Sequence, residues 1–253
     1  MATTNKITVT GHRGAAGLAP ENTLASIQLA LDLGVDRIEI DVQQTKDNVI
    51  IVLHDRSLRR TTTGVGFVKT KNYADILKLS AGFKFNKYYA KEKVPTLEQV
   101  IQLINGKAEL LIETKYSFMY YPNIERHIIN VIKQNNAKAW CKVISFNDRA
   151  LFRVHKLDNE IRTGKLFVGK HANLPLSWDK GVNIKPLRRY HFVDEIIVKH
   201  THATAKIIDR VHKMGKELHV WTVNDPETIE LLVERGVDGI ISDYPNLLMK
   251  YKK

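Results

Sequence analysis

Short apolar runs rich in β-branched residues alternate with amphipathic segments along most of the chain. The apolar runs have the length of strands, and the segments between them repeat apolar residues at helical spacing. This alternation predicts repeated βα units around a parallel sheet. We expect strands at residues 7–11, 37–42, 109–114, 142–146, 163–168, 195–199, 218–223 and 239–242, and helices at residues 23–33, 96–104, 123–134, 149–157, 203–214 and 226–235.

The strand count predicts the fold class, because a TIM (β/α)8 barrel is built from eight parallel strands with helices between them. One further strand, at residues 49–53, follows the second strand after a turn at residues 45–48. That turn is too short for a parallel crossover, so we expect this strand to return as a hairpin arm. Residues 56–94 then form a small predicted insertion, rich in loops with short helices, within a single domain at residues 1–253.

Composition narrows the class of protein without identifying it. Of the 253 residues 43% are hydrophobic, which is enough for one large core. Lys and Arg outnumber Asp and Glu by 39 to 27, and the formal charge of +12 predicts anionic partners. The chain has one cysteine, Cys141, so no internal disulfide can form. Because Cys141 lies in an apolar run, we expect it to be buried rather than to take part in thiol chemistry.

The sequence also bears on location. The amino terminus lacks the apolar core of a signal peptide, and no apolar run approaches membrane-spanning length. We therefore expect a cytoplasmic protein without stable membrane insertion. Nothing in the sequence determines its oligomeric state.

Two carboxylates share one face of the second predicted strand. Side chains alternate along a strand, so Glu39 and Asp41 point to one side while Ile38 and Ile40 point to the other. Like charges held this close raise each other's pKa unless a cation intervenes, and a hard divalent metal is a common solution. A polar strand face paired with lysines is the alternative for this motif taken alone.

Glu113 and Lys115 repeat the arrangement at the end of the third predicted barrel strand. TIM barrels place their active sites at the carboxyl ends of the strands, where Glu39, Asp41 and Glu113 would meet. Three carboxylates without Cys-x-x-Cys or His-x-x-x-His spacing suit Mg²⁺ or Ca²⁺ better than zinc. The sequence therefore predicts one divalent cation as cofactor, with no preference between these two ions.

Two histidines are expected on the same rim. His12 and Arg13 follow the first strand, and His54 and Asp55 end the hairpin arm. Cleavage of a phosphodiester at neutral pH needs one group to remove a proton from the attacking hydroxyl and another to protonate the departing alkoxide. Two imidazoles beside a metal site therefore favour metal-assisted cleavage of a phosphate ester.

Taken together, the motifs resemble the glycerophosphodiester phosphodiesterase family. They span nearly the whole chain in the expected order: Gly11-His12-Arg13-Gly14, Ala19-Pro20-Glu21-Asn22-Thr23, Glu39-Ile40-Asp41-Val42, His54-Asp55, Arg60-Thr61-Thr62-Thr63-Gly64, Pro95-Thr96-Leu97-Glu98, Ile112-Glu113-Thr114-Lys115, Trp221-Thr222-Val223-Asn224 and residues 236–245. The chain departs from the usual family pattern at residues 82–85, near which a tryptophan is common, and at Ser242, where threonine is common.

The resemblance implies a TIM barrel with a small insertion, and hydrolysis of a small-molecule glycerophosphodiester to glycerol 3-phosphate and an alcohol. It also implies that a glycerol hydroxyl attacks phosphorus first and that water opens the resulting cyclic phosphate. The implied roles are acid-base catalysis for His12 and His54, binding of the divalent cation for Glu39, Asp41 and Glu113, and binding of the phosphate for Arg13 and Lys115.

Other residues are expected at the edge of this site. Glu21 would orient catalytic groups or touch the substrate, or else cap the following helix, for which Asn22 and Thr23 are also candidates. Trp221 would pack against the glycerol carbons, and Phe146 would line the same pocket. Either aromatic side chain could instead belong to the barrel core.

Two competing functions fit parts of the sequence. A phospholipase D-like enzyme acting on sphingomyelin or lysophospholipids would share the barrel and the paired histidines, but the lack of a leader and the single cysteine argue against it. A non-enzymatic module binding nucleic acid or anionic membranes is supported by the net charge alone, and no nucleic-acid recognition motif is present. The basic stretch at residues 169–191 is either a lid or a solvated loop.

Overall fold

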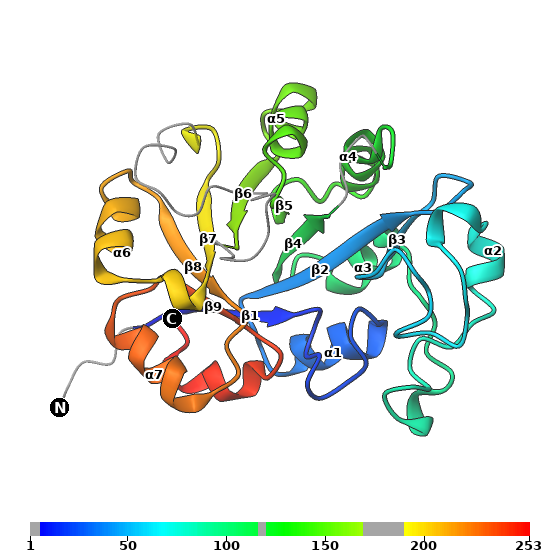
Figure 1. Ribbon diagram of the computed structural model, residues 1–253, viewed down its shortest axis with the longest axis horizontal. Coiled ribbons are helices and arrows are strands. Elements are labelled where there is room, and N and C mark those ends of the chain that lie inside the picture. The colour runs from blue at the N-terminus through cyan, green and yellow to red at the C-terminus, as the bar shows by residue number, and fades with distance from the viewer. Residues whose placement is uncertain (1–5, 116–119, 169–189) are drawn as a thin grey trace, which may run out of the picture.

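The barrel predicted from the alternating pattern is present in the computed structural model, which describes residues 6–115, 120–168 and 190–253 (Figure 1). Eight parallel strands pair in chain order, and the pairing of the second strand with the first and of the first with the last closes the ring. The strands are β1 (Thr8–His12), β2 (Arg37–Gln44), β4 (Glu109–Thr114), β5 (Cys141–Ser145), β6 (Arg162–Phe167), β7 (Glu195–Lys199), β8 (Glu217–Trp221) and β9 (Gly239–Ser242).

Helices surround this ring in Figure 1. They are α1 (Leu24–Asp32), α3 (Leu97–Ile104), α4 (Ile124–Gln134), α5 (Asp148–Leu157), α6 (Ala205–His212) and α7 (Pro226–Glu234), followed by a 3-10 helix, η5 (Pro245–Tyr251). Thr23 caps α1, because its hydroxyl oxygen accepts a hydrogen bond from the Ser26 amide at 3.2 Å. Among the described residues, no helix is both long and apolar enough to cross a membrane.

The observed boundaries lie within two residues of the predicted ones, and two of the differences have a local cause. The strand expected at residues 218–223 ends at Trp221, because its pairing with β7 stops there. The helix expected from residue 203 begins at Ala205, because Thr204 takes the cap position and its hydroxyl oxygen accepts from the Ile207 amide. Cys141 lies in β5 and is buried, as predicted, and burial raises the pKa of its thiol to about 12.

The predicted hairpin arm is β3 (Ile50–Val52), which runs antiparallel to β2 with Val52 opposite Val42. The segment after it contains η1 (Val68–Thr70), α2 (Tyr73–Ile76) and η2 (Lys87–Tyr89). It has a small core of its own, made by Leu58, Val68, Ile76, Ala81 and Val94 with Ile51 and Leu53. In Figure 1 this insertion is the cyan and teal region at one side of the barrel, next to α1 and α3.

The barrel interior has an apolar layer, formed by Leu111, Ile144, Leu166, Ile197 and Ile241. Alternation along each strand places a charged layer on its amino-terminal side and the predicted site on its carboxyl-terminal side. In the charged layer, Arg37 and Lys142 contact the Glu195 carboxylate at 2.9 and 2.6 Å. This layer was not predicted from the sequence.

Candidate active site

The three predicted carboxylates meet at the carboxyl ends of neighbouring strands. Asp41 lies opposite Glu113 in the β2–β4 ladder, and Glu39 lies opposite His12 in the β1–β2 ladder. One oxygen atom from each of Glu39, Asp41 and Glu113 lies within 4.8 Å of the others. All three side chains are buried. The acidic cluster expected from the strand pattern is therefore formed, and it could hold a metal ion.

Two cations lie against this acidic cluster. The Lys115 ammonium is 2.7 Å from Glu113 Oε1 and 3.0 Å from Asp41 Oδ1. Arg13 places its Nε 3.2 Å from Asp41 Oδ2, and its backbone N–H donates to Glu39 Oε2 at 3.1 Å. When all three carboxylates are ionised, they carry one negative charge more than these two cations neutralise.

The electrostatics show which carboxylate lacks compensation. Burial raises the pKa of Glu39 well above its ordinary value, and the charges of Asp41 and Glu113 raise it further. Burial acts in the same direction on Asp41, but Lys115 and Arg13 outweigh it and hold the pKa of that carboxyl low. Glu39 Oε1 is buried and has no hydrogen-bond partner among the described residues. A hard, oxygen-liganded divalent cation would satisfy this atom, so the residues fit such an ion.

A tight turn after β1 presents His12 and Arg13 to the cluster. Arg13 has a left-handed φ of 54° and Gly14 one of 86°. A Cβ atom at Gly14 would lie 2.4 Å from Ser26 Oγ, so only glycine fits there. The same Ser26 hydroxyl donates to the Arg13 carbonyl at 2.9 Å. The backbone conformation of this turn therefore explains the glycine at position 14, just as the chemistry of the site explains His12 and Arg13.

His12 is held by a residue from the far end of the chain. Its Nδ1 lies 2.6 Å from Asp243 Oδ1, and its Nε2 lies 3.9 Å from Glu39 Oε2. Asn224 fixes Asp243 by donating from Nδ2 to Oδ2 at 2.6 Å and accepting from the Asp243 amide at 2.9 Å. A carboxylate at Nδ1 keeps a proton on that nitrogen and leaves Nε2 available on the side of the acidic cluster.

His54 has an equivalent arrangement on the hairpin arm. Its Nδ1 lies 2.5 Å from Asp55 Oδ1. The arm is fixed to β2, because the Leu53 amide donates to the Asp41 carbonyl at 2.9 Å and Gln43 Nε2 donates to the His54 carbonyl at 2.8 Å. Burial lowers the pKa of His54, while the Asp41 carboxylate opposes this effect. Both predicted histidines therefore have a carboxylate partner at Nδ1.

Glu21 joins two arginines rather than capping α1. It accepts hydrogen bonds from Arg13 at 2.8 Å and from Arg60 at 2.6 Å. Arg60, in the insertion, also donates from Nε to Asp55 Oδ2 at 2.6 Å. Arg60 belongs to one of the family motifs, but the motif alone does not predict the contact of Arg60 with Asp55, the partner of His54.

Asn22, a capping candidate, instead contacts the acidic cluster. Its amide nitrogen donates to Asp41 Oδ2 at 2.9 Å, and its oxygen accepts from the Asp41 backbone N–H at 3.2 Å. Asn22 has a left-handed φ of 59°, a conformation that asparagine adopts more readily than most residues. The Pro-Glu-Asn-Thr loop thus supports Asp41 and Arg13 directly.

The two predicted aromatic residues lie together above the apolar layer of the barrel. The rings of Trp221 and Phe146 pack edge to face with centroids 5.4 Å apart, and both are partly buried. The indole Nε1 of Trp221 is buried without a hydrogen-bond partner among the described residues. Contact between these rings and a ligand stays a prediction.

A second group of potential ligands lies at the opposite end of the barrel. Side-chain atoms of Glu195, Glu217 and His219 also lie within 4.8 Å of one another. Here Arg37 and Lys142 contact Glu195 directly, so ion pairs already supply the counter-charge. This group therefore has a structural explanation that needs no metal.

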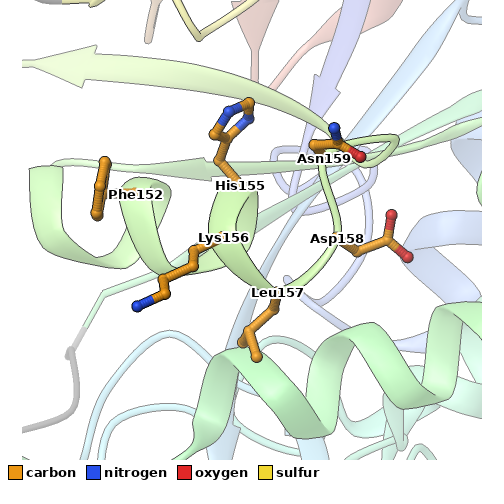
Figure 2. Close-up of a pocket in the computed structure, with 6 residues that line it drawn as sticks. All are labelled: Phe152, His155, Lys156, Leu157, Asp158 and Asn159. Atoms are coloured by element: carbon orange, nitrogen blue, oxygen red, sulfur yellow. The ribbon is translucent and has the colours of Figure 1, made fainter.

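A surface pocket elsewhere does not coincide with the acidic cluster. It is formed by the last turns of α5 and the loop that follows, and Figure 2 shows its lining residues Phe152, His155, Lys156, Leu157, Asp158 and Asn159. None of the predicted site residues lines it. Of the basic stretch predicted as a lid or loop, residues 169–189 lie outside the described residues.

Comparison with known proteins identifies the family. The model of the glycerophosphoryl diester phosphodiesterase family matches residues 12–247. A glycerophosphodiester phosphodiesterase of Caldanaerobacter subterraneus subsp. tengcongensis is 37% identical over 245 residues, covering 96% of this chain and 97% of that protein. A glycerophosphodiester phosphodiesterase of Bacillus subtilis is 33% identical over 98% of this chain and 87% of its own length.

Solved structures show the same architecture. A phosphodiesterase of Oleispira antarctica, in complex with the product sn-glycerol-3-phosphate, superposes with a TM-score of 0.85 at 28% identity, covering 97% of this chain and 96% of that one. A glycerophosphodiester phosphodiesterase of Agrobacterium tumefaciens gives a TM-score of 0.81 at 27% identity, covering 97% and 99%. The chain therefore belongs to the glycerophosphoryl diester phosphodiesterase family and is a phosphoric diester hydrolase of that kind.

Proposed function

We propose that this protein hydrolyses glycerophosphodiesters to sn-glycerol 3-phosphate and an alcohol with the help of one divalent cation. The proposal is carried by one arrangement, in which three buried carboxylates lie beside two imidazoles that are each hydrogen-bonded to a further carboxylate. The product bound to the Oleispira antarctica relative supports the substrate class.

Glu39, Asp41 and Glu113 would hold Mg²⁺ or Ca²⁺, both of which prefer oxygen ligands. When bound, the cation would supply positive charge that stabilises the phosphate oxygens. Arg13 and Lys115 already contact this acidic cluster, and both would bind the nonbridging oxygens as negative charge develops on them.

His12 and His54 would move the protons. Nε2 of one imidazole removes the proton from the glycerol hydroxyl next to the ester, and the freed oxygen forms a bond to phosphorus. The bond from phosphorus to the alcohol oxygen breaks, and the other imidazole protonates that oxygen. The products of this step are a cyclic glycerol phosphate and the alcohol.

In the second step the two histidines exchange roles. One removes a proton from water, which attacks phosphorus and opens the ring, and the other protonates the departing ring oxygen to give glycerol 3-phosphate. Asp243 and Asp55 would hold the imidazoles in orientation throughout, since each accepts from an Nδ1. Trp221 would pack against the glycerol carbons, and Glu21 would keep Arg13 in position.

The test is release of glycerol 3-phosphate from glycerophosphocholine with Mg²⁺, with Ca²⁺ and after removal of metal by EDTA. We expect EDTA to abolish turnover and one of the two ions to restore it. His12→Ala and His54→Ala should each lose at least about 100-fold in kcat with an unchanged circular dichroism spectrum. Full activity in EDTA, or full activity of either histidine variant, would contradict the proposal.

The same assay addresses the substrate. Glycerophosphoethanolamine and glycerophosphoglycerol test which alcohol is preferred. Lysophosphatidylcholine tests the phospholipase D-like alternative, because that activity releases choline from the lysolipid without forming glycerol 3-phosphate. Choline release from the lysolipid at a rate exceeding hydrolysis of glycerophosphocholine would favour the alternative.

A further inference from the structure

The insertion at residues 56–94 carries most of the excess positive charge of the chain. It contains 10 Lys and Arg residues against 2 Asp and Glu residues, a formal charge of +8 within a total of +12. A charge imbalance concentrated in one segment is typical of a surface that meets an anionic partner.

The same insertion exposes large apolar side chains. Of the ten large hydrophobic residues most exposed in the described part of the chain, six lie in it: Val65, Phe67, Leu77, Phe83, Phe85 and Tyr88. Their exposure does not reflect a lack of core, because the insertion packs its own apolar cluster around Leu58 and Val68. Exposed apolar residues mark an interaction surface where they gather in one place, and three of these six, Phe83, Phe85 and Tyr88, lie within six consecutive residues.

Aromatic and basic residues are closest together in residues 82–91, here called the aromatic loop. Tyr88 is 84% exposed and Phe83 is 54% exposed, while Lys87 and Lys91 are exposed beside them. Turns fix this loop, because the Phe85 amide donates to the Gly82 carbonyl at 3.0 Å and the Tyr89 amide to the Asn86 carbonyl at 2.9 Å. The loop is therefore a defined structure that presents both kinds of side chain.

The aromatic loop is connected to the candidate active site. The Lys84 ammonium donates to the carbonyl of Arg59. The next residue, Arg60, donates to both Asp55 and Glu21. The loop and the candidate active site are therefore connected through two consecutive residues of the insertion, Arg59 and Arg60.

We infer that the aromatic loop docks the protein onto the surface of an anionic lipid bilayer. Lysines next to exposed aromatic rings suit this partner, because the lysines meet anionic headgroups while the rings enter the interfacial region. Docking of this kind is peripheral and needs no spanning helix. It is independent of the proposed reaction, since the surface lies outside the acidic cluster and its binding is measured without turnover.

Co-sedimentation with vesicles tests this surface. The full chain should bind vesicles of phosphatidylcholine with phosphatidylglycerol at least about tenfold better than vesicles of phosphatidylcholine alone, and salt should weaken binding. The double variants F83A/Y88A and K87Q/K91Q should each lose at least about fivefold in binding to anionic vesicles. Their circular dichroism spectra and their hydrolysis of soluble glycerophosphocholine should stay at the wild-type level.

Matched controls separate the loop from overall charge and hydrophobicity. Phe152 and Leu231 are exposed apolar residues on α5 and α7, and Lys156 and Lys206 are exposed lysines outside the insertion. F152A/L231A and K156Q/K206Q should bind vesicles as the wild type does. Equal losses in loop and control variants, or no vesicle binding, would overturn the inference. Tighter binding to single-stranded DNA than to anionic vesicles would overturn it in favour of a nucleic-acid partner.

Discussion

His12 and Asp243 lie 231 positions apart in the sequence, yet the Nδ1 of the imidazole is 2.6 Å from Oδ1 of the carboxylate. They meet because β9 pairs with β1 and closes the barrel, with Gly11 opposite Ser242 in the ladder. Closure of the barrel therefore does more than complete the fold. It supplies the group that orients one of the two proposed catalytic histidines.

Asp243→Asn should lower kcat by about 10- to 100-fold while leaving KM for glycerophosphocholine nearly unchanged. The amide is similar in size but does not stabilise the imidazolium that forms during proton transfer. The pH dependence of kcat/KM should shift as well, which a purely structural role would not produce. Asp209→Asn, an exposed carboxylate on α6, is the control. An unchanged pH profile for Asp243→Asn would argue against a positioning role.

Arg60→Ala should reduce kcat/KM by about tenfold, because Arg60 holds Asp55 and Glu21 at the same time. Arg60→Lys should recover little of this loss, since an ammonium cannot reproduce the hydrogen bonds of a planar guanidinium to two carboxylates. Steady-state kinetics on both variants measures the effect. Full recovery by lysine would show that only the charge matters.

Glu39→Gln should affect the thermal unfolding temperature differently with and without metal. In EDTA it should leave the thermal unfolding temperature equal to that of the wild type or raise it, because it removes a buried carboxylate that lies against two others. Saturating Mg²⁺ or Ca²⁺ should stabilise the wild type by about 3 kcal/mol at a hundredfold excess over Kd, and Glu39→Gln should lose this gain.

Thermal unfolding with and without metal measures both effects of Glu39→Gln. Glu98→Gln, at an exposed position in α3, is the control and should behave as the wild type does. Stabilisation of Glu39→Gln by metal to the wild-type extent would place the ion elsewhere.

Acid should destabilise the charged layer at the amino-terminal end of the barrel. Burial would raise the pKa of Glu195, but His219, Lys142 and Arg37 outweigh it and lower that pKa from 4.5 to about 2. A lowered pKa in the folded state contributes stability above pH 4.5 that is lost as pH falls towards 2. The free energy of unfolding in urea should therefore fall steeply over this range.

Glu195→Gln tests the source of that acid sensitivity. The variant should lose about 3–5 kcal/mol at neutral pH, because the buried Lys142 loses its nearest carboxylate at 2.6 Å and keeps only Glu109 at 3.8 Å. Its stability should then depend less on pH between 4.5 and 2 than that of the wild type. Parallel pH dependences would assign the acid sensitivity to other groups.

The period-two pattern predicted much of this molecule. Glu39 and Asp41 share a face because side chains alternate along β2, and Glu113 joins them because parallel strands bring their carboxyl ends together. Both inferences need only the strand assignment and the barrel. The hairpin arm followed from a turn too short for a parallel crossover.

What the pattern could not predict depends on three-dimensional contacts. Asp243 belongs to the motif at residues 236–245 and directly follows β9, the strand that pairs with β1. The sequence therefore places Asp243 near His12, but it does not predict the direction of the Asp243 side chain. The contact of Asn22 with Asp41 depends on a left-handed backbone at Asn22. Arg37, Lys142 and Glu195 come from three different strands. In the sequence each is a charged residue at the start of an apolar run, a position that is usually exposed to solvent.

The most direct test of the account is a crystal structure with Mn²⁺, which shares the oxygen preference of Mg²⁺ and Ca²⁺, and with sn-glycerol 3-phosphate. We expect one anomalous peak, from a Mn²⁺ ion coordinated by Glu39, Asp41 and Glu113, and we expect the phosphate to lie between His12 and His54. An anomalous peak only at Glu195, Glu217 and His219, or no peak at either group with the product bound elsewhere, would contradict it.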